Sequence, residues 1–461
     1  MSPASIAPIG NAALARGAGA ASNPLLDAPI PRTILRLTAP SLVLALFQTA
    51  VSVGDTYFVG RLGTDALAGL ALAFPLVMLL QMLSAGAMGG GVSSAIARAL
   101  GANDRAQART LVAHALVIAM VAGVLFTLLL LAFGAGLYAL LGGRGDALGQ
   151  AMRYSDVLFA GAVFVWLANT LASALRGSGN TLVPAIALVS AAIVQVPLSG
   201  ALTLGWSPLP QLGIRGTALS YVIAFALASV GLAIHLWSTP LRPQRADWQL
   251  ARQRFREILR VGAISSLGAL QTVLTAILLT GFVAGFGSAA LAGYGVGVRL
   301  ELLQVPIVFA VGQALVVMVG THVGARRAER AKRIAWSGAA AAVLVCLAIG
   351  VFVAVFPSAW VGIFSDDPAV LATGGLYLRI VAPTYPLFGA GLALYFASQG
   401  AGRILLPMLA GTARLLVVLV GGILVLNLAA PLGWLFAVIA VGLTTLGMLT
   451  ALVVHWTPWQ K

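Results

Sequence analysis

The feature that most constrains this chain is a series of long apolar runs, which follow one another from residue 34 almost to the C-terminus. A helix that crosses a bilayer needs roughly 20 apolar residues, and runs that do not alternate with polar residues disfavour a β-barrel. The sequence therefore predicts an all-α polytopic membrane protein with twelve transmembrane helices. The expected spans are 34–60, 66–93, 106–132, 147–175, 181–204, 213–238, 254–285, 288–320, 328–356, 368–399, 405–427 and 431–456.

Composition supports this prediction, because 60% of the residues are hydrophobic and only 8% are charged, whereas soluble domains carry about a quarter charged residues. A net charge of +15 would suggest a nucleic-acid partner in a soluble protein, but the placement of the charges gives a better explanation. With the N-terminus inside, 20 of the 27 Lys and Arg residues fall in inner segments and five in outer ones. This asymmetry predicts cytoplasmic termini in the inner (plasma) membrane, and no nucleic-acid partner.

An internal repeat organises the spans. Gly63 recurs as Gly287 at a shift of 224, and the motif RGSGNTLVP from Arg176 recurs as QGAGRILLP from Gln399 at a shift of 223. Each repeat holds six spans, and an even number returns the chain to its starting side. The halves are therefore expected to be parallel repeats, forming two six-helix lobes that face each other across a central cavity.

The expected domain boundaries follow from this repeat. They are a flexible N-terminal tail at 1–32, an N-terminal lobe at 33–238, a cytoplasmic linker at 239–253 and a C-terminal lobe at 254–461. The tail is rich in Ala, Gly, Pro and Ser and lacks the pattern of a signal peptide.

The linker has an apolar face at helical spacing, formed by Trp248, Ala251, Phe255 and Leu259, with arginines on the rest. This pattern favours an amphipathic helix on the inner membrane surface. The alternative is a solvated basic linker whose last residues simply begin the seventh span.

Two acids lie well inside the expected spans, Asp55 in the first and Glu301 in the eighth. Neither can face lipid cheaply, so both should point into a lobe or into the cavity. Asp55 is either a carboxylate that couples transport to a cation or proton, or a structural acid satisfied by hydroxyl and amide groups. For Glu301 the structural alternative includes pairing with Arg299 or Arg414.

With these residues in view, the chain resembles the MATE (multidrug and toxic compound extrusion) family. The resemblance covers all twelve spans and rests on motifs in a fixed order, together with the repeat of six plus six spans. The motifs are QTAVSVGDTYFVGRLGTDALAG, SSAIARALGAND, ALRGSGNT and QLGIRGTALSYV.

The resemblance implies a V-shaped secondary antiporter that expels organic cations or other amphipathic compounds in exchange for protons or sodium ions. The arrangement is most similar to the branch that includes the DNA-damage-inducible proteins, in which a first-helix aspartate binds the coupling ion. Asp55 stands in that place, and Asn169 matches an asparagine of the fourth helix. Gln195 and Ser199 replace an asparagine and an aspartate, which departs from the sodium-binding pattern of that branch.

These arguments give two sets of candidate residues. Tyr221 joins the first set because its hydroxyl can hydrogen-bond one protonation state of the coupling site. The predicted ion-coupling residues are Asp55, Asn169, Gln195, Ser199 and Tyr221, and the predicted substrate-cavity residues are Gln48, Gln271, Arg299 and Glu301.

Other functional classes fit less well. A flippase for lipid-linked oligosaccharides of the same superfamily would need several cations in its cavity, and only Arg299 and Arg414 fall within spans. A membrane receptor would normally add an output domain. The sequence has no metal-ligand spacing, phosphate loop or nucleophile motif, so we expect a monomeric transporter rather than an enzyme, with no metal and no cofactor beyond the coupling ion.

Overall fold

The computed structural model describes residues 25–459, and every regular element within them is a helix. Eleven of these helices are long and apolar enough to cross a membrane. A further pair bent by 51°, Gly145–Ala160 with Ala162–Gly177, brings the number to twelve if it is counted as one span. The predicted fold class is therefore confirmed, and each expected span coincides with one of these helices or with the bent pair.

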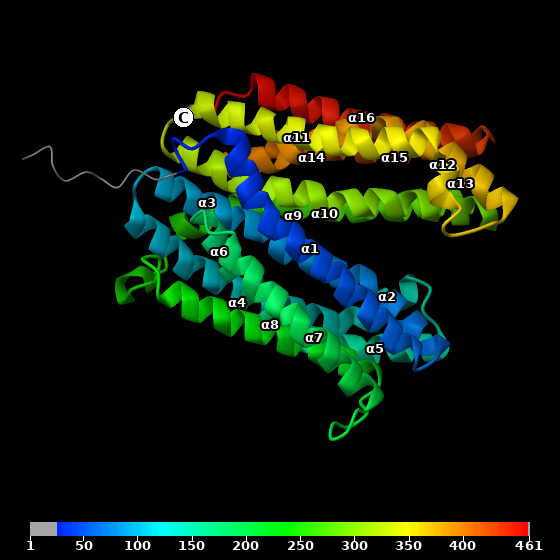
Figure 1. The fold of residues 1–461 in the computed structure, drawn as a ribbon, viewed down its shortest axis with the longest axis horizontal. Coiled ribbons are helices and arrows are strands. Elements are labelled where there is room, and N and C mark those ends of the chain that lie inside the picture. Colours follow the sequence, from blue (N-terminus) through cyan, green and yellow to red (C-terminus); the bar gives the residue numbers. More distant parts are fainter. Residues whose placement is uncertain (1–24, 460–461) are drawn as a thin grey trace, which may run out of the picture.

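The N-terminal lobe is the lower bundle in Figure 1. Its second span combines α2, a π-helical segment and α3, and its fourth span is the bent pair α5–α6, which breaks at Gly161. The elements of this lobe are α1 (Ile30–Gly60), α2 (Thr64–Gln81), η2 (Met82–Met88), α3 (Gly89–Gly101), α4 (Arg105–Leu140), α5 (Gly145–Ala160), α6 (Ala162–Gly177), α7 (Leu182–Leu204) and α8 (Ile214–Trp237).

The C-terminal lobe is the upper bundle in Figure 1. Its fourth span is also interrupted, by a 3-10 turn that contains Pro383. The elements after α8 are η3 (Arg245–Trp248), α9 (Arg252–Ala284), α10 (Ser288–Gly324), α11 (Ala328–Val355), α12 (Pro357–Val361), α13 (Pro368–Val381), η4 (Ala382–Thr384), α14 (Tyr385–Gly400), α15 (Leu405–Asn427) and α16 (Leu432–Trp456).

The two lobes meet at one end of the molecule and diverge toward the other (Figure 1). We call the first the linker end, because it holds the linker after α8 and the turns at 101–104 and 325–327, and the second the distal end. At the linker end the contacts repeat with a two-fold relation. A Cβ on Gly101 would lie 2.0 Å from the Thr321 carbonyl oxygen, and one on Gly324 would lie 2.1 Å from the Arg98 carbonyl oxygen. Each pair follows from the other by the shift of 223, as expected for parallel repeats.

Helix α1 belongs to both lobes. Its first turns place Ile34 and Leu37 in the hydrophobic core of the C-terminal lobe, whereas Leu44 and Val59 belong to the core of the N-terminal lobe. Pro40 lies between the two sets. The predicted boundary at residue 33 assigns α1 to the N-terminal lobe, but the first turns of this helix pack on the C-terminal lobe.

The segment before α1 is also docked on the C-terminal lobe. Residues 1–24 of the predicted tail lie outside the described residues, but Arg327 donates to Asp27 at 2.7 Å and Arg330 donates to the Ala28 carbonyl at 2.8 Å. The last residues of the predicted tail, from Ile30, already form α1.

The linker differs from the amphipathic surface helix that we favoured for 239–253. It contains only the four-residue turn η3, and α9 then starts at Arg252 and continues into the membrane span. Pro240 and Pro243 interrupt the chain after α8, and Asp247 fixes the turn by accepting a 2.8 Å hydrogen bond from the backbone N–H of Gln244. This arrangement is the alternative interpretation, a basic linker that leads directly into the seventh span.

Candidate ion-coupling site and substrate-binding residues

Asp55 lies on the buried stripe of α1 that faces α7. Leu44, Val51 and Val59 share this stripe, because residues at helical spacing repeat on one face. Only 8% of Asp55 is exposed. A carboxylate in such surroundings needs donors.

Helix α7 supplies these donors. Ser199 Oγ donates to Asp55 Oδ1 at 2.6 Å, and Gln195 Nε2 donates to Asp55 Oδ2 at 3.3 Å. The two donors are four residues apart, so they project from the same face of α7. The structure thus brings together three of the five predicted ion-coupling residues.

The other two, Asn169 and Tyr221, lie in a second network. Asn169 Nδ2 donates to Gln81 Oε1 at 3.0 Å and to Ser84 Oγ at 2.9 Å. The Gln81 amide in turn donates to the Tyr221 hydroxyl. Among the described residues, neither Asn169 nor Tyr221 forms a hydrogen bond to Asp55, but the Asp55 charge acts electrostatically on the hydroxyl of Tyr221.

Gln81 and Ser84 are functional candidates that the sequence analysis missed. They stand where α2 passes into the π-helical segment η2. A π-helical turn holds more residues than an α-helical turn, so it changes which side chains face inward. Such segments are frequent at functional sites. A signal for both residues exists, since they are polar groups inside an otherwise apolar run, but nothing in the sequence pattern indicates the π-helical segment itself.

In the C-terminal lobe, Glu301 on α10 accepts a hydrogen bond from the Tyr377 hydroxyl of α13. The Tyr377 ring is held edge-on against Tyr294 and Phe436, at centroid distances of 5.5 and 5.1 Å. Arg414 of α15 interacts electrostatically with Glu301, but the two form no ion pair within 4 Å among the described residues. The predicted alternative of a direct Glu301–Arg414 pair is therefore not what the structure has.

The other predicted substrate-binding residues have different surroundings, and none of them forms a hydrogen bond or an ion pair with Glu301 among the described residues. The Arg299 guanidinium lies over the Phe364 ring, 5.2 Å from its centroid, and the residue is exposed. Gln271 is half-buried and donates to Thr412 Oγ1 at 2.8 Å. Gln48 is exposed within a stretch of α1, residues 46–50, that is exposed around the whole helix.

The chemistry available at Asp55 is limited. In the described part of the chain, no three His, Cys, Asp or Glu side chains gather as a metal site would require. Asp55 contributes one carboxylate, with one hydroxyl and one amide beside it. Such a group can take up and release a proton, or contribute one charged oxygen to a cation.

Comparison with known proteins now adds to this geometry. The family model MatE matches residues 40–200 and again residues 265–424, one match in each lobe. A FAD transporter from Shewanella oneidensis is 27% identical over 81% of this chain and 82% of its own length. The probable multidrug resistance protein NorM from Thermotoga maritima is 24% identical over 82% of each chain.

Solved structures agree with this assignment. A crystal structure described as MATE in the bent conformation has a TM-score of 0.85 and 25% identity, and the match covers 94% of this chain and 96% of that one. A transporter of the MOP superfamily from Pyrococcus furiosus shares the fold with the same TM-score and 24% identity, again over 94% and 96% of the two chains. The branch within the family stays a prediction. From these matches and the two six-helix lobes, the chain belongs to the MATE family of multidrug efflux transporters, and its bacterial relatives imply a place in the plasma membrane.

Proposed function

We propose that this protein is a secondary antiporter that exports organic cations and other amphipathic compounds in exchange for protons, with Asp55 as the coupling group. The observation that carries the proposal is the position of Asp55, a buried carboxylate held by two donors from a different helix. Burial disfavours the charged form, and the donors favour it. A group balanced in this way can bind and release a proton during transport.

Proton binding at Asp55 would act through the contact between α1 and α7. The ionised carboxylate accepts from both Ser199 and Gln195. A protonated carboxyl gains an O–H that needs an acceptor, and its hydroxyl oxygen accepts more weakly than a carboxylate oxygen, so the contacts with Ser199 and Gln195 weaken or change when the proton binds. A proton can shift a conformational equilibrium only through such differential contacts.

Helix α1 offers a route from this site to the linker end. Its first turns pack in the core of the C-terminal lobe, and Pro40 lies between them and Asp55. At the linker end, Gln399 Nε2 donates across the lobe interface to the Gly86 carbonyl at 3.2 Å, and Arg98 donates to the Gly400 carbonyl at 3.1 Å. A change in the bend or position of α1 would therefore alter the packing between the two lobes at the linker end, which has to open for alternating access.

The test is transport into reconstituted vesicles, driven separately by a pH gradient and by a sodium gradient, with ethidium as the cationic probe. We expect the pH gradient alone to drive ethidium accumulation, and Asp55→Asn to abolish it while ethidium binding is retained. Asp156→Asn is the matched control, because Asp156 is an exposed acid on α5. Transport driven only by the sodium gradient would show that sodium, and not the proton, is the coupling ion. Transport driven by the pH gradient in Asp55→Asn would show that Asp55 is not the coupling group.

A second candidate substrate is a flavin dinucleotide. The relative from Shewanella oneidensis is named as a FAD transporter, and Arg414 is a half-buried cation whose buried Nε has no hydrogen-bond partner among the described residues. An anionic compound would need such a cation, because an uncompensated charge in a low-dielectric site is costly. Transport of FAD and of ethidium in the same vesicles, each alone and in competition, decides between the two substrates. Accumulation of FAD that Arg414→Gln abolishes would favour the flavin dinucleotide.

A further inference from the structure

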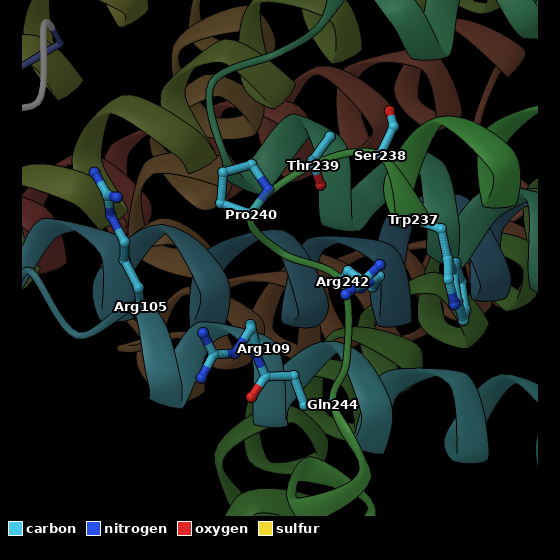
Figure 2. Close-up of a pocket in the computed structure, with 8 residues that line it drawn as sticks. All are labelled: Arg105, Arg109, Trp237, Ser238, Thr239, Pro240, Arg242 and Gln244. Carbon is cyan, nitrogen blue, oxygen red and sulfur yellow. The ribbon is translucent and has the colours of Figure 1, made fainter.

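A basic pocket lies at the linker end of the N-terminal lobe, away from the coupling site. It has a volume of about 420 Å³. Three arginines line it: Arg105 and Arg109 from the start of α4, and Arg242 from the linker after α8 (Figure 2). The rest of the lining is Trp237, Ser238, Thr239, Pro240 and Gln244.

The pocket carries unbalanced positive charge. Among the described residues, Arg105 and Arg242 form no ion pair, and both are exposed. Arg109 Nε lies 3.4 Å from Asp247 Oδ2, and that carboxylate also accepts hydrogen bonds from the backbone N–H of Gln244 and the Thr110 hydroxyl, each at 2.8 Å. Asp247 thus offsets one arginine and leaves two positive charges for a ligand.

Asp247 stays ionised in this arrangement. Its burial would raise the pKa of the carboxyl, but the Gln244 amide, the Thr110 hydroxyl and the Arg109 charge together lower the pKa below its ordinary value. The Arg109–Asp247 ion pair therefore joins the linker to α4 at neutral pH.

An apolar groove continues from the basic pocket along the membrane-facing side of the lobe. It has a volume of about 520 Å³ and runs between α4, α6 and α8, with Met120, Phe164 and Val230 among its walls. Trp237 lines both hollows. The one hydroxyl among the lining residues, that of Ser229, lies within hydrogen-bond distance of two backbone carbonyls, that of Phe225 at 2.8 Å and that of Phe164 at 2.9 Å.

The position of the tryptophans fits a membrane interface. Trp237 at the end of α8 and Trp248 in η3 are 41% and 43% exposed, and exposed tryptophans gather at the level of lipid headgroups. The basic pocket then lies at headgroup depth and the groove at acyl-chain depth. The two positive charges match a headgroup, and apart from the indole N–H groups of Trp237 and Trp248 the groove offers almost only apolar surface, which suits an acyl chain.

We infer that this composite site binds one anionic phospholipid, with its phosphate between Arg105 and Arg242 and an acyl chain in the groove beside Trp237. Basic pockets between transmembrane helices recognise such headgroups, and guanidinium groups match the geometry of phosphate oxygens. The lipid would bridge α4 and the linker that joins the two lobes.

The test is lipid retention by the purified full-length protein in mild detergent, measured by native mass spectrometry with dioleoyl phosphatidylglycerol and dioleoyl phosphatidylcholine. We expect one retained phosphatidylglycerol and preferential binding over phosphatidylcholine. The double variant Arg105→Gln/Arg242→Gln should bind phosphatidylglycerol about thirtyfold more weakly, which corresponds to about 1 kcal/mol for each arginine.

A matched control removes the same charge nearby. Arg245→Gln/Arg252→Gln changes two exposed arginines, the first residues of η3 and of α9, that line neither hollow, and it should alter the affinity less than threefold. Equal losses in both double variants would reduce the effect to general surface charge and overturn the site.

Two further measurements distinguish the contribution of the groove to lipid binding from that of the basic pocket. Ala233→Leu fills the groove from α8 and should weaken phosphatidylglycerol binding, whereas Ile234→Leu, on the exposed side of the same helix, should not. Inorganic phosphate at the same concentration should not displace the lipid. Full displacement by phosphate, or unchanged binding in Ala233→Leu with the protein still folded, would show that the acyl chain has no part and would overturn the proposal.

Discussion

The two lobes come from one repeat, yet they hold their buried acids in different ways. In the N-terminal lobe, Asp55 on the first helix faces two donors of α7. The residue at the repeat position in the C-terminal lobe is Leu279, which is buried in an apolar core. That lobe carries its acid instead on its second helix, where Glu301 accepts from Tyr377. The repeat therefore preserves the helical frame of the lobes, while each lobe has its own buried acid and its own donors.

The donors diverge together with the acid. The shift of 223 relates Gln195 to Val418 and Ser199 to Gly422, and neither of these offers a side-chain donor. A Cβ on Gly422 would lie 2.3 Å from the Phe282 ring, so even a serine would be crowded there. A carboxylate at position 279 would therefore find no partner, which is why the two lobes are not interchangeable.

The strongest test of this asymmetry makes the N-terminal lobe resemble the C-terminal one. We expect Asp55→Leu to abolish pH-driven efflux of ethidium, because no titratable group remains between α1 and α7. Vesicle transport measures this, with the Asp156→Asn variant as the reference for an acid outside the site. Substantial proton-driven transport by Asp55→Leu would show that the C-terminal lobe couples on its own.

The reverse exchange tests the donors. Leu279→Asp in the Asp55→Leu background should not restore transport, and it should destabilise the protein by about 3 kcal/mol or more, since it buries a carboxyl without a partner. Thermal unfolding in detergent measures the loss of stability. Recovery of efflux in this double variant would mean that the position of the acid matters and the α7 donors do not.

A smaller effect is expected at Glu301. Glu301→Gln should reduce efflux of a monovalent cation severalfold and that of a neutral compound much less, because the carboxylate attracts cations in a low-dielectric space. Tyr377→Phe is the matched control, since it removes the donor and keeps the charge. An equal loss for both substrates in Glu301→Gln would contradict a role in charge selection.

The two donors at Asp55 should also be unequal. Ser199 lies 2.6 Å from the carboxylate and Gln195 lies 3.3 Å from it, and a short hydrogen bond to a charged group contributes more than a long one. We expect Ser199→Ala to slow pH-driven efflux more than Gln195→Leu does, with Thr203→Val on the same helix as the control. The reverse order would mean that the amide is the main partner of Asp55.

Much of this architecture is predictable from the sequence, for a physical reason. Apolar runs and basic turns place all twelve spans, and the repeat finds both lobes because backbone requirements are conserved with it. Gly63 and Gly287 both adopt positive φ, at 118° and 101°, as do Asn103 and Arg326 at 60° and 59°. Positions of this kind are constrained locally, so they remain visible in the sequence.

The remainder depends on packing that no periodicity encodes. The π-helical segment η2 rotates Ser84 toward Asn169, and an apolar run has the same pattern with or without it. The crossing of α1 from one lobe to the other depends on where Ile34 finds a core. Arg299 is a predicted cavity residue because it is a charge inside a span, and its cation–π contact with Phe364 could not be read from the sequence.

The smallest effect that we predict is a change in melting temperature, and it concerns the two ion pairs that hold the segments preceding each lobe. Asp247 docks the linker on Arg109 of α4, and Asp27 docks the segment before α1 on Arg327, next to α11. The hydrogen bond and charge of Arg327 lower the pKa of Asp27, and the net effect of its partners lowers that of Asp247, against its burial. The two side chains differ in exposure, 9% for Asp247 and 69% for Asp27, and solvent weakens exposed pairs.

Because both pKa values are depressed in the folded protein, each acid stabilises it above the ordinary Asp pKa of about 3.9, and this contribution is lost as the pH falls through the lower folded value. We expect Asp247→Asn to lower the melting temperature at pH 7 by on the order of 1 °C, and Asp27→Asn to lower it less. Below pH 3 both differences from the native chain should shrink. An equal or larger effect of Asp27→Asn at pH 7 would show that the exposed pair holds its lobe as firmly as the buried one.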